Sequence, residues 1–299
     1  MKLARQLAWY RLLTALTPRR SAAHARWFGK KQRLQTLMAQ KAETNAWDAR
    51  IAEALACPDI GFLPRHPQAG TFAGNDQIMH NGLRVAQGSY YGRHMQRLLA
   101  LSQGVHEPQE ERVFNEVLKK MPAGATMLEL GAYWAFYSLW FHQQVPQARN
   151  IMVEPDQTNL NLGRLNFAAN GYTGEFFRGY LGEHYRPHAS DAPVVSVDWL
   201  ADRFKLDHIH LLHSDIQGHE LAMLRGADRM LRERRVDYIF ISTHSETLQA
   251  DCRASLIAHN YMVVAEHTLA ESYSVDGLVV GRRQELAGLE HVDVSKKRA

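Results

Sequence analysis

The chain has 299 residues, of which 45% are hydrophobic and 22% are charged, a balance typical of a folded globular protein. Its two cysteines, Cys57 and Cys252, lie in no metal-binding or redox spacing, which argues against a disulfide framework and indicates a reducing compartment. No stretch reaches the roughly 18 consecutive apolar residues of a membrane span. The apolar runs near the N-terminus are too short and too often interrupted by arginine for a signal peptide, so we expect a cytoplasmic protein.

The net charge of +4 is unevenly distributed along the chain. Residues 1–42, the basic arm, contain ten basic and no acidic side chains, so the remainder carries a net charge of −6. Aromatic residues such as Trp9 and Trp27 stand among these charges, as in a helix that lies on a membrane surface. Three roles stay open for the basic arm: a helical cap on the acidic body, a peripheral membrane contact, or nucleic-acid binding, which the acidic body disfavours.

The predicted elements divide the chain into four parts. Residues 1–57 are rich in Ala, Leu, Arg and Lys and predict a basic helical extension. Clustered prolines and glycines in residues 58–105 predict a connector of short strands and turns. Residues 106–285 alternate between short apolar runs and helical patterns, as in an α/β domain, and residues 286–299 form a polar tail.

Within residues 106–285, seven strands and five helices are predicted. Strands are expected at 126–130, 151–153, 175–178, 209–214, 238–242, 261–265 and 278–281, and helices at 110–120, 135–143, 157–170, 220–232 and 248–259. Strands separated by helices indicate a parallel sheet with right-handed crossovers. The last two strands are joined only by a loop, so that pair is expected to be antiparallel. A sheet of this kind binds ligands at the carboxyl ends of its strands.

The first predicted strand runs into a tight turn and then a helix. Gly131 can adopt a positive φ and lets a ligand approach the backbone, and the N–H groups that begin the helix suit a carboxylate or phosphate. A dinucleotide fingerprint needs three glycines and this loop has one, which argues against a pyrophosphate. Glu154 ends the next strand, 25 residues beyond Glu129, where a carboxylate can accept both hydrogen bonds of a ribose diol. Together, these three residues predict a nucleoside-containing cofactor.

Several segments carry a family resemblance. They are Leu128-Glu-Leu-Gly-Ala132, Val153-Glu-Pro-Asp156, His213-Ser-Asp-Ile-Gln-Gly-His-Glu220 and Leu224-Arg-Gly-Ala227. Over about residues 105–282 the chain resembles the FkbM family of methyltransferases. The resemblance implies S-adenosyl-L-methionine as the cofactor and transfer of its methyl group to a hydroxyl of a small molecule, sugar or glycan. It also implies a Rossmann-like class I sheet of seven mostly parallel strands, with the last antiparallel.

The resemblance assigns roles by position. It places Glu129 and Gly131 along the methionine part of the cofactor, Glu154 at the ribose and Glu107 near the amino group. The predicted cofactor-binding residues are Glu107, Glu129, Gly131, Tyr133, Glu154, Pro155 and Asp198. Ala135 stands where the family usually has glycine, and we expect its methyl group to affect cofactor affinity more than the fold.

Three polar side chains follow neighbouring strands and form the predicted reaction centre. Asp215 is the central residue, and His219 or His244 is the general base, because histidine is the commonest group in that role. Alternatively, Asp215 only caps the helix that begins near Gly218. His213 would join these side chains as a metal ligand, but no dense ligand motif is present and we expect no metal site.

Four functions compete. The leading hypothesis is an S-adenosylmethionine-dependent O-methyltransferase. The alternatives are a non-catalytic cofactor-binding protein, in which Ala135 has ended catalysis, a nucleic-acid methyltransferase steered by the basic arm, and an NAD-dependent oxidoreductase, which the missing glycines disfavour. The loop at 266–281 either borders the acceptor pocket or forms a solvated hairpin. The sequence specifies neither the acceptor nor the oligomeric state, because acceptor pockets are built from variable loops.

Overall fold

A computed structural model describes residues 43–187 and 191–298. The chain divides into two compact units, Met1–Ala49 and Arg50–Ala299. Of the first unit only residues 43–49 are described, and they are helical. The predicted roles of the basic arm fall outside the described residues and stay predictions. Among the described residues, no helix has the length and apolar character needed to cross a membrane.

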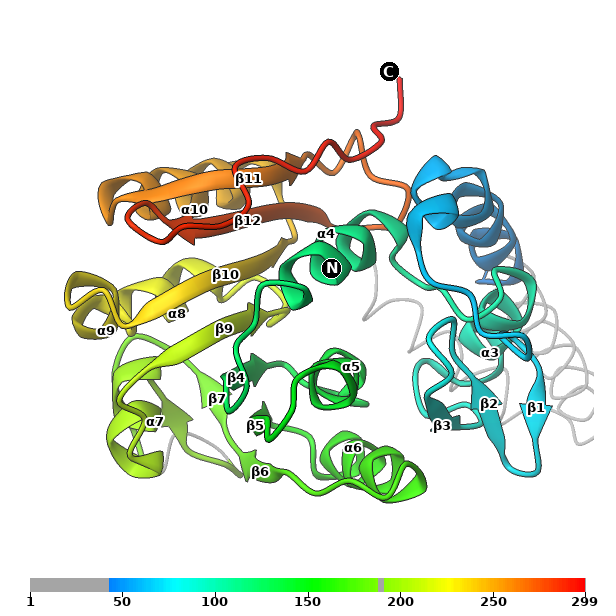
Figure 1. The fold of residues 1–299 in the computed structure, drawn as a ribbon, viewed down its shortest axis with the longest axis horizontal. Coiled ribbons are helices and arrows are strands. Elements are labelled where there is room, and N and C mark those ends of the chain that lie inside the picture. The colour runs from blue at the N-terminus through cyan, green and yellow to red at the C-terminus, as the bar shows by residue number, and fades with distance from the viewer. Residues whose placement is uncertain (1–42, 188–190, 299) are drawn as a thin grey trace, which may run out of the picture. The chain divides into compact units, whose positions relative to one another are not determined.

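A seven-stranded sheet forms the centre of the second unit (Figure 1). Its spatial order is β11 (Tyr261–His267), β12 (Gly277–Arg283), β10 (Val236–Thr243), β9 (Ile209–Ser214), β4 (Thr126–Leu130), β5 (Arg149–Glu154) and β6 (Glu175–Arg178). β12 is antiparallel to both neighbours, and all other pairs are parallel. This confirms the predicted fold of seven mostly parallel strands with the last antiparallel. The strand order reverses between β4 and β9, which is where such sheets bind ligands.

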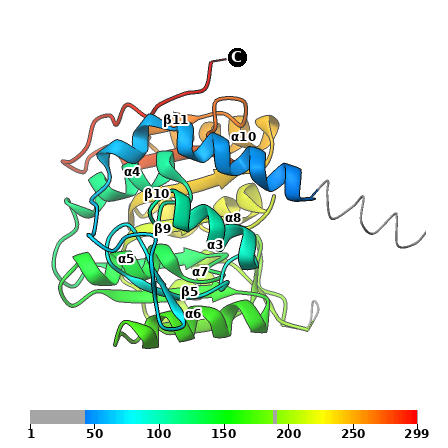
Figure 2. The ribbon, with the colours of Figure 1, turned by 90° about the vertical axis from the view of Figure 1, so that its right-hand side faces the viewer.

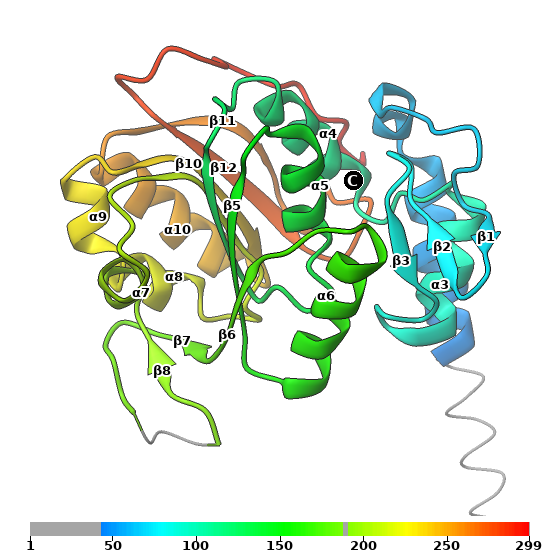
Figure 3. The ribbon, with the colours of Figure 1, turned by 60° about the horizontal axis from the view of Figure 1, so that its bottom comes forward.

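Helices cover both faces of the sheet (Figure 3). One face carries α4 (Pro108–Leu118), α5 (Phe136–Gln144) and α6 (Gln157–Ala169); the other carries α7 (Val197–Phe204), α8 (Glu220–Arg225), α9 (Asp228–Arg232) and α10 (Glu246–Ala258). Leu128, Leu212 and Ile239 belong to a continuous aliphatic core against the second group. Strands buried on both faces have near-continuous apolar sequences, which explains why short apolar runs located them.

Two helical regions differ from the sequence prediction. The helix predicted at 220–232 is two helices, because the chain turns at Gly226, where a Cβ would lie 2.5 Å from the carbonyl oxygen of Gly182. The prediction assigned no helix to α7, although Ser196 caps it by accepting a hydrogen bond from the Trp199 N–H at 3.1 Å. A Ser at this position is a common helix-start signal.

The connector packs on the α6 side of the sheet (Figure 2). It contains η1 (Pro58–Phe62), β1 (Phe72–Ala73), β2 (Asp76–Ile78), β3 (Arg84–Ala86) and the unpredicted helix α3 (Gly92–Leu101). Asn166 of α6 accepts a hydrogen bond from the Ala86 N–H at 2.8 Å, and Asn170 accepts one from the Arg84 N–H at 2.9 Å. These amides supply β3 with partners that an edge strand lacks, so the connector is part of the same compact unit.

Three shorter segments complete the second unit. β7 (Tyr180–Leu181) and β8 (Val194–Val195) form a small parallel pair. The polar tail docks on η1, because the Ser295 N–H donates to Asp59 Oδ2 at 2.9 Å. Val292 and Val294 of the tail are buried.

Candidate functional site

A cavity of about 900 Å³ opens where β4, β5 and β9 end. This volume lies within the range of small-molecule sites. Eight of the predicted site residues line it: Glu107, Glu129, Gly131, Tyr133, Glu154, Pro155, Asp215 and His219. The structure thus brings together side chains from positions 107 to 219, as expected for the carboxyl edge of a parallel sheet.

Three residues of the loop after β4 have positive φ values, although only one of them is glycine. Gly131, Tyr133 and Ala135 adopt φ values of 75°, 43° and 59°, a left-handed conformation that costs a non-glycine residue about 1–2 kcal/mol. A Cβ on Gly131 would lie 1.8 Å from the carbonyl oxygen of Asp215, so only glycine fits there. Two non-glycine residues of this loop thus have the left-handed backbone that glycine adopts most readily.

The methyl group of Ala135 faces α6. Ala135 is fully buried, and a Cβ built on Gly163 would lie 3.2 Å from the Ala135 Cβ. Its neighbours Tyr133 and Trp134 line the cavity, whereas Ala135 does not. The cavity wall therefore gives no support to the expectation that this methyl group lowers cofactor affinity.

Glu129 occupies the N-terminus of α5. Its Oε2 accepts a hydrogen bond from the Ser138 N–H at 3.2 Å. Burial raises the pKa of Glu129 to about 7, against the opposing charge of His213 and the N–H groups of α5. The N–H groups that the sequence suggested for a cofactor carboxylate thus already have a carboxylate partner from the protein.

Glu154 is fixed at the cavity wall by the backbone around it. Its two oxygens accept hydrogen bonds from the N–H groups of Tyr133 at 3.1 Å and Asp156 at 3.0 Å. Burial raises the pKa of this carboxyl group. Oε1 also accepts a bond from Asn159 Nδ2 at 3.4 Å, whereas Oε2 accepts only the Tyr133 N–H among the described residues and keeps capacity for a hydroxyl donor in the cavity.

Glu107 ends a buried array of charged side chains. Its Oε2 lies 3.1 Å from His106 Nε2 and accepts a hydrogen bond from the Tyr137 hydroxyl at 3.1 Å. His106 Nδ1 lies 2.6 Å from Glu111 Oε1, and His80 Nε2 lies 3.1 Å from Glu111 Oε2.

The charges in this array support one another. Burial alone would lower the pKa of His106, but the charges of Glu107 and Glu111 raise it to about 10. Burial likewise opposes ionisation of Glu107, yet His106 lowers the pKa of that carboxyl to about 2. Sequence reasoning missed Glu111, because an acid in the first turns of a helix normally faces solvent.

A second buried array joins α4 to the sheet. Glu110 Oε1 lies 2.6 Å from His213 Nε2, and Glu110 Oε2 accepts a hydrogen bond from the Ser242 hydroxyl at 2.9 Å. His213 and Ser242 both line the cavity. Only the metal-ligand alternative drew attention to His213 in the sequence, and Glu110 carried no signal there.

Asp215 is held beside His244 at the edge of the cavity. His244 Nε2 lies 3.2 Å from Asp215 Oδ1 and 3.4 Å from Asp276 Oδ1, and its Nδ1 lies 3.0 Å from Glu220 Oε1. Burial opposes protonation, but hydrogen bonding to Asp215 and Glu220 raises the pKa of His244 to about 10. The neighbouring carboxylates thus favour the protonated imidazole, which fixes Asp215, and the role of base stays a prediction for His244.

Hydrogen bonds in the loop after β9 bear on the two roles that the sequence left open for Asp215, a reaction-centre residue or a helix cap. Glu220 Oε1 accepts the loop N–H groups of Ile216 at 3.3 Å and Gly218 at 3.1 Å. Asp215 instead accepts a hydrogen bond from the Gln217 side chain at 3.0 Å. The local backbone is thus satisfied by Glu220, and the Asp215 carboxylate stays available to the cavity.

Asp198 lies outside the cavity lining, unlike the other predicted cofactor-binding residues. Its carboxylate accepts the N–H groups of Arg229 at 3.0 Å and Met230 at 3.1 Å. Asp198 therefore caps α9, which satisfies two of the helix's free N–H groups. The structure gives it a structural position where the sequence predicted cofactor binding.

Aromatic side chains that the sequence analysis did not select form another wall of the cavity. Tyr90 stacks on Trp134 with ring centroids 4.6 Å apart, and contacts Tyr133 edge-on at 5.0 Å. Tyr91 contacts Tyr133 at 5.4 Å. The connector thus brings two tyrosines onto the loop after β4, where they border the cavity.

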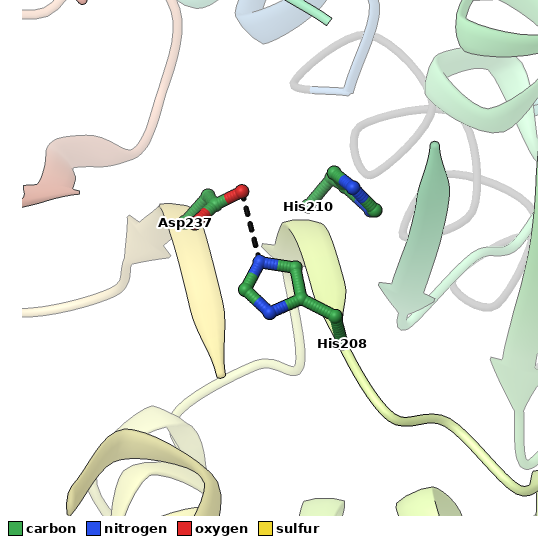
Figure 4. Close-up of side chains that lie close together, drawn as sticks. All are labelled: His208, His210 and Asp237. Atoms are coloured by element: carbon green, nitrogen blue, oxygen red, sulfur yellow. Dashed lines mark ion pairs between the residues drawn. The ribbon is translucent and has the colours of Figure 1, made fainter. Parts of the chain in front are cut away.

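Two groups of side chains among the described residues have metal-like spacing: Asp215, Glu220 and His244, and His208, His210 and Asp237. In the second group His208 Nε2 pairs with Asp237 at 2.9 Å (Figure 4). His210 Nδ1 accepts the Thr126 N–H at 3.0 Å, and Asp237 also pairs with Arg283 at 2.9 Å. The side chains of both groups thus have partners within the protein. In the first group, His244 lies between carboxylates.

Solved structures with a similar fold are distant in sequence. TrmK from M. capricolum, in complex with S-adenosyl-homocysteine, is 12% identical over 60% of this chain and 71% of its own, with a TM-score of 0.41. A precorrin methyltransferase from Geobacter metallireducens is 15% identical over 57% of this chain and 87% of its own, with a TM-score of 0.40. No curated protein matches the chain significantly.

A family model described as the methyltransferase FkbM domain matches residues 183–267. The matched segment contains Asp215, His219 and His244, and ends before β12. The sheet order, the loop at Gly131 and this match over residues 183–267 together support an S-adenosylmethionine-dependent methyltransferase.

Proposed function

We propose that this protein transfers a methyl group to a hydroxyl of a small molecule, sugar or glycan. The proposal depends on one observation: Asp215 and His219 line the same cavity as Gly131 and Glu154. A residue able to bind the acceptor hydroxyl therefore lies beside the residues suited to the cofactor. Such proximity is the main requirement of a methyl transfer, in which the acceptor oxygen must align with the methyl group.

The cavity residues fit S-adenosylmethionine. Gly131 lets the loop after β4 lie against the Asp215 carbonyl at the cavity, and Oε2 of Glu154 retains acceptor capacity suited to a ribose hydroxyl. Glu107, whose ionised form is favoured by His106, suits an ammonium group. When bound, S-adenosylmethionine supplies an electrophilic methyl group on its sulfonium sulfur.

The residues of the chain prepare the acceptor. Asp215, held by His244 and Gln217, accepts a hydrogen bond from the acceptor hydroxyl and orients it. His219 is exposed at the cavity and begins α8, and its imidazole takes up the hydroxyl proton. General-base assistance of this kind contributes about 10²–10⁴-fold to a rate.

Charged side chains of both signs line the cavity. Arg186, His106 and His213 line it together with five carboxyl side chains, namely Glu107, Glu129, Glu154, Glu183 and Asp215. A nucleic-acid substrate would bring phosphates close to these groups, whereas nucleic-acid sites are normally basic. The position of Ala135 against Gly163 also supports a catalytic protein over a non-catalytic cofactor-binding protein.

Turnover to S-adenosylhomocysteine tests the proposal, with pools of sugars, lipid-linked glycans and small alcohols as acceptors. Asp215→Asn is expected to lower kcat at least 100-fold while the Kd for S-adenosylhomocysteine stays within a few-fold. Asp202→Asn is the matched control, because its side chain is 70% exposed and lies outside the cavity. Unchanged turnover in Asp215→Asn would overturn the role of Asp215, and methylation of nucleic acid alone would overturn the acceptor class.

A further inference from the structure

One nitrogen at the cavity wall has no partner. His213 is only 3% exposed, and its Nδ1 makes no hydrogen bond to any residue that the structure describes. Its Nε2, in contrast, is bound to Glu110 Oε1 at 2.6 Å. A buried polar atom without a partner costs about 1–3 kcal/mol. Because His213 lines the cavity, a ligand there is the natural partner of this nitrogen.

The surroundings of His213 favour a proton on both ring nitrogens. Glu110 contacts His213 and accepts a bond from Ser242, although burial raises the pKa of Glu110 itself. Burial alone would lower the pKa of His213, but the hydrogen bond and charge of Glu110 raise it. An imidazolium donates from both nitrogens, so Nδ1 presents an N–H to the cavity.

Two other sets of donors, at the N-terminus of α5 and at His106, already have partners. The N-terminus of α5 donates to Glu129 through Ser138. Both ring nitrogens of His106 face carboxylates, Glu107 at 3.1 Å and Glu111 at 2.6 Å. An anionic ligand group that reaches His213 therefore meets its unpartnered Nδ1.

His213 and Glu107 flank the same side chain. The Tyr137 hydroxyl donates to Glu107 at 3.1 Å, and the Tyr137 ring lies 4.2 Å from the His213 ring, centroid to centroid. His213 and Glu107, one on each side of Tyr137, are charges of opposite sign that suit the carboxylate and the ammonium group of an α-amino acid. The methionine part of S-adenosylmethionine carries such a pair.

We propose that His213 binds the carboxylate of the methionine part of the cofactor through Nδ1–H, while Glu107 faces its ammonium group. The proposal rests on S-adenosylmethionine as the cofactor and adds a residue that recognises its amino-acid end. Glu110 and Ser242 are then positioning residues that hold the imidazolium in place.

Binding of three ligands, measured by isothermal titration, tests this role. S-Adenosylhomocysteine has the complete amino-acid end, its decarboxylated analogue lacks only the carboxylate, and 5′-methylthioadenosine lacks the amino-acid end. The wild-type protein is expected to bind the decarboxylated analogue at least 10-fold more weakly than S-adenosylhomocysteine. This comparison needs no variant and is independent of catalytic activity.

Two substitutions separate the ring nitrogens. In His213→Gln the amide nitrogen can replace Nε2 and keep the bond to Glu110, but the donor at Nδ1 is lost. In His213→Asn the amide nitrogen stands near Nδ1. We expect His213→Gln to raise the Kd for S-adenosylhomocysteine at least 10-fold and the Kd for both truncated ligands less than 3-fold. His213→Asn should recover part of the lost affinity for S-adenosylhomocysteine. His259→Gln, outside the cavity lining, is the control.

The outcomes distinguish this role from the proposed function. If His213→Gln lowers the affinity for all three ligands by the same factor, or for none of them, His213 does not bind the carboxylate. If the wild-type protein binds the decarboxylated analogue as tightly as S-adenosylhomocysteine, the proposal also fails. Failure of the wild-type protein to bind any of the ligands would instead overturn the cofactor on which the proposed function depends.

Discussion

Gly131→Ala tests whether close contact between two loops builds the cofactor site. A Cβ at this position would lie 1.8 Å from the Asp215 carbonyl oxygen and 2.8 Å from its carbon. Normal carbon–oxygen contacts are about 3.3 Å or longer, so the two loops must separate by more than 1 Å. That movement breaks the hydrogen bond from the Asp215 N–H to the Leu130 carbonyl, which measures 3.0 Å.

The expected cost is the sum of two effects. A left-handed alanine costs about 1–2 kcal/mol, and loss of the inter-loop hydrogen bond costs about 1 kcal/mol more. We therefore expect the free energy of unfolding to fall by about 2–3 kcal/mol. The Kd for S-adenosylhomocysteine should rise at least 10-fold, because the shift displaces both Gly131 and Asp215.

Gly124→Ala isolates the contact from the backbone conformation. Gly124 has φ 76°, almost the same as Gly131, but a Cβ there would meet no atom within 4 Å. This control should lose only about 1–2 kcal/mol and keep its ligand affinity. Urea unfolding and isothermal titration measure both quantities. If Gly124→Ala loses as much stability and as much affinity as Gly131→Ala, the reasoning is refuted, because the contact with Asp215 would then have no effect of its own.

Three further predictions concern other parts of the site. Ala135→Gly should change the Kd for S-adenosylhomocysteine less than 3-fold by titration, since the methyl group faces Gly163; a tenfold gain in affinity would show instead that it crowds the cofactor. Glu154→Ala should raise the Kd for both S-adenosylhomocysteine and 5′-methylthioadenosine at least 10-fold. A loss of affinity for only one of the two ligands would contradict a ribose contact. His106 has its pKa raised to about 10, so the stability it contributes is complete below about pH 6.5 and is lost as the pH rises through 10. The decline in the free energy of unfolding between pH 7 and 10 should therefore be smaller in His106→Gln, and an unchanged decline would contradict the buried ion pairs.

Local sequence was sufficient to predict the sheet. The strands predicted at β4, β6 and β9 coincide with the observed strands. β4 is buried along its whole length, as parallel strands with apolar sequences are. The loop that joins the last two strands is too short for a parallel crossover, which fixed the direction of β12. α3 was missed because the surrounding glycines and prolines masked its apolar positions Met95, Leu98 and Leu99.

The sequence by itself determined the cofactor-facing edge, since Glu129, Gly131, Glu154 and Asp215 follow directly from strand ends. Only the tertiary structure decided which polar side chains are paired. It placed Asp198 under α9, and it put His244 between carboxylates. It left His213 with one unpartnered nitrogen at the cavity. Partners such as Glu110 and His213 are 103 residues apart, and the charge state of a buried group depends on such distant neighbours, which no local pattern records.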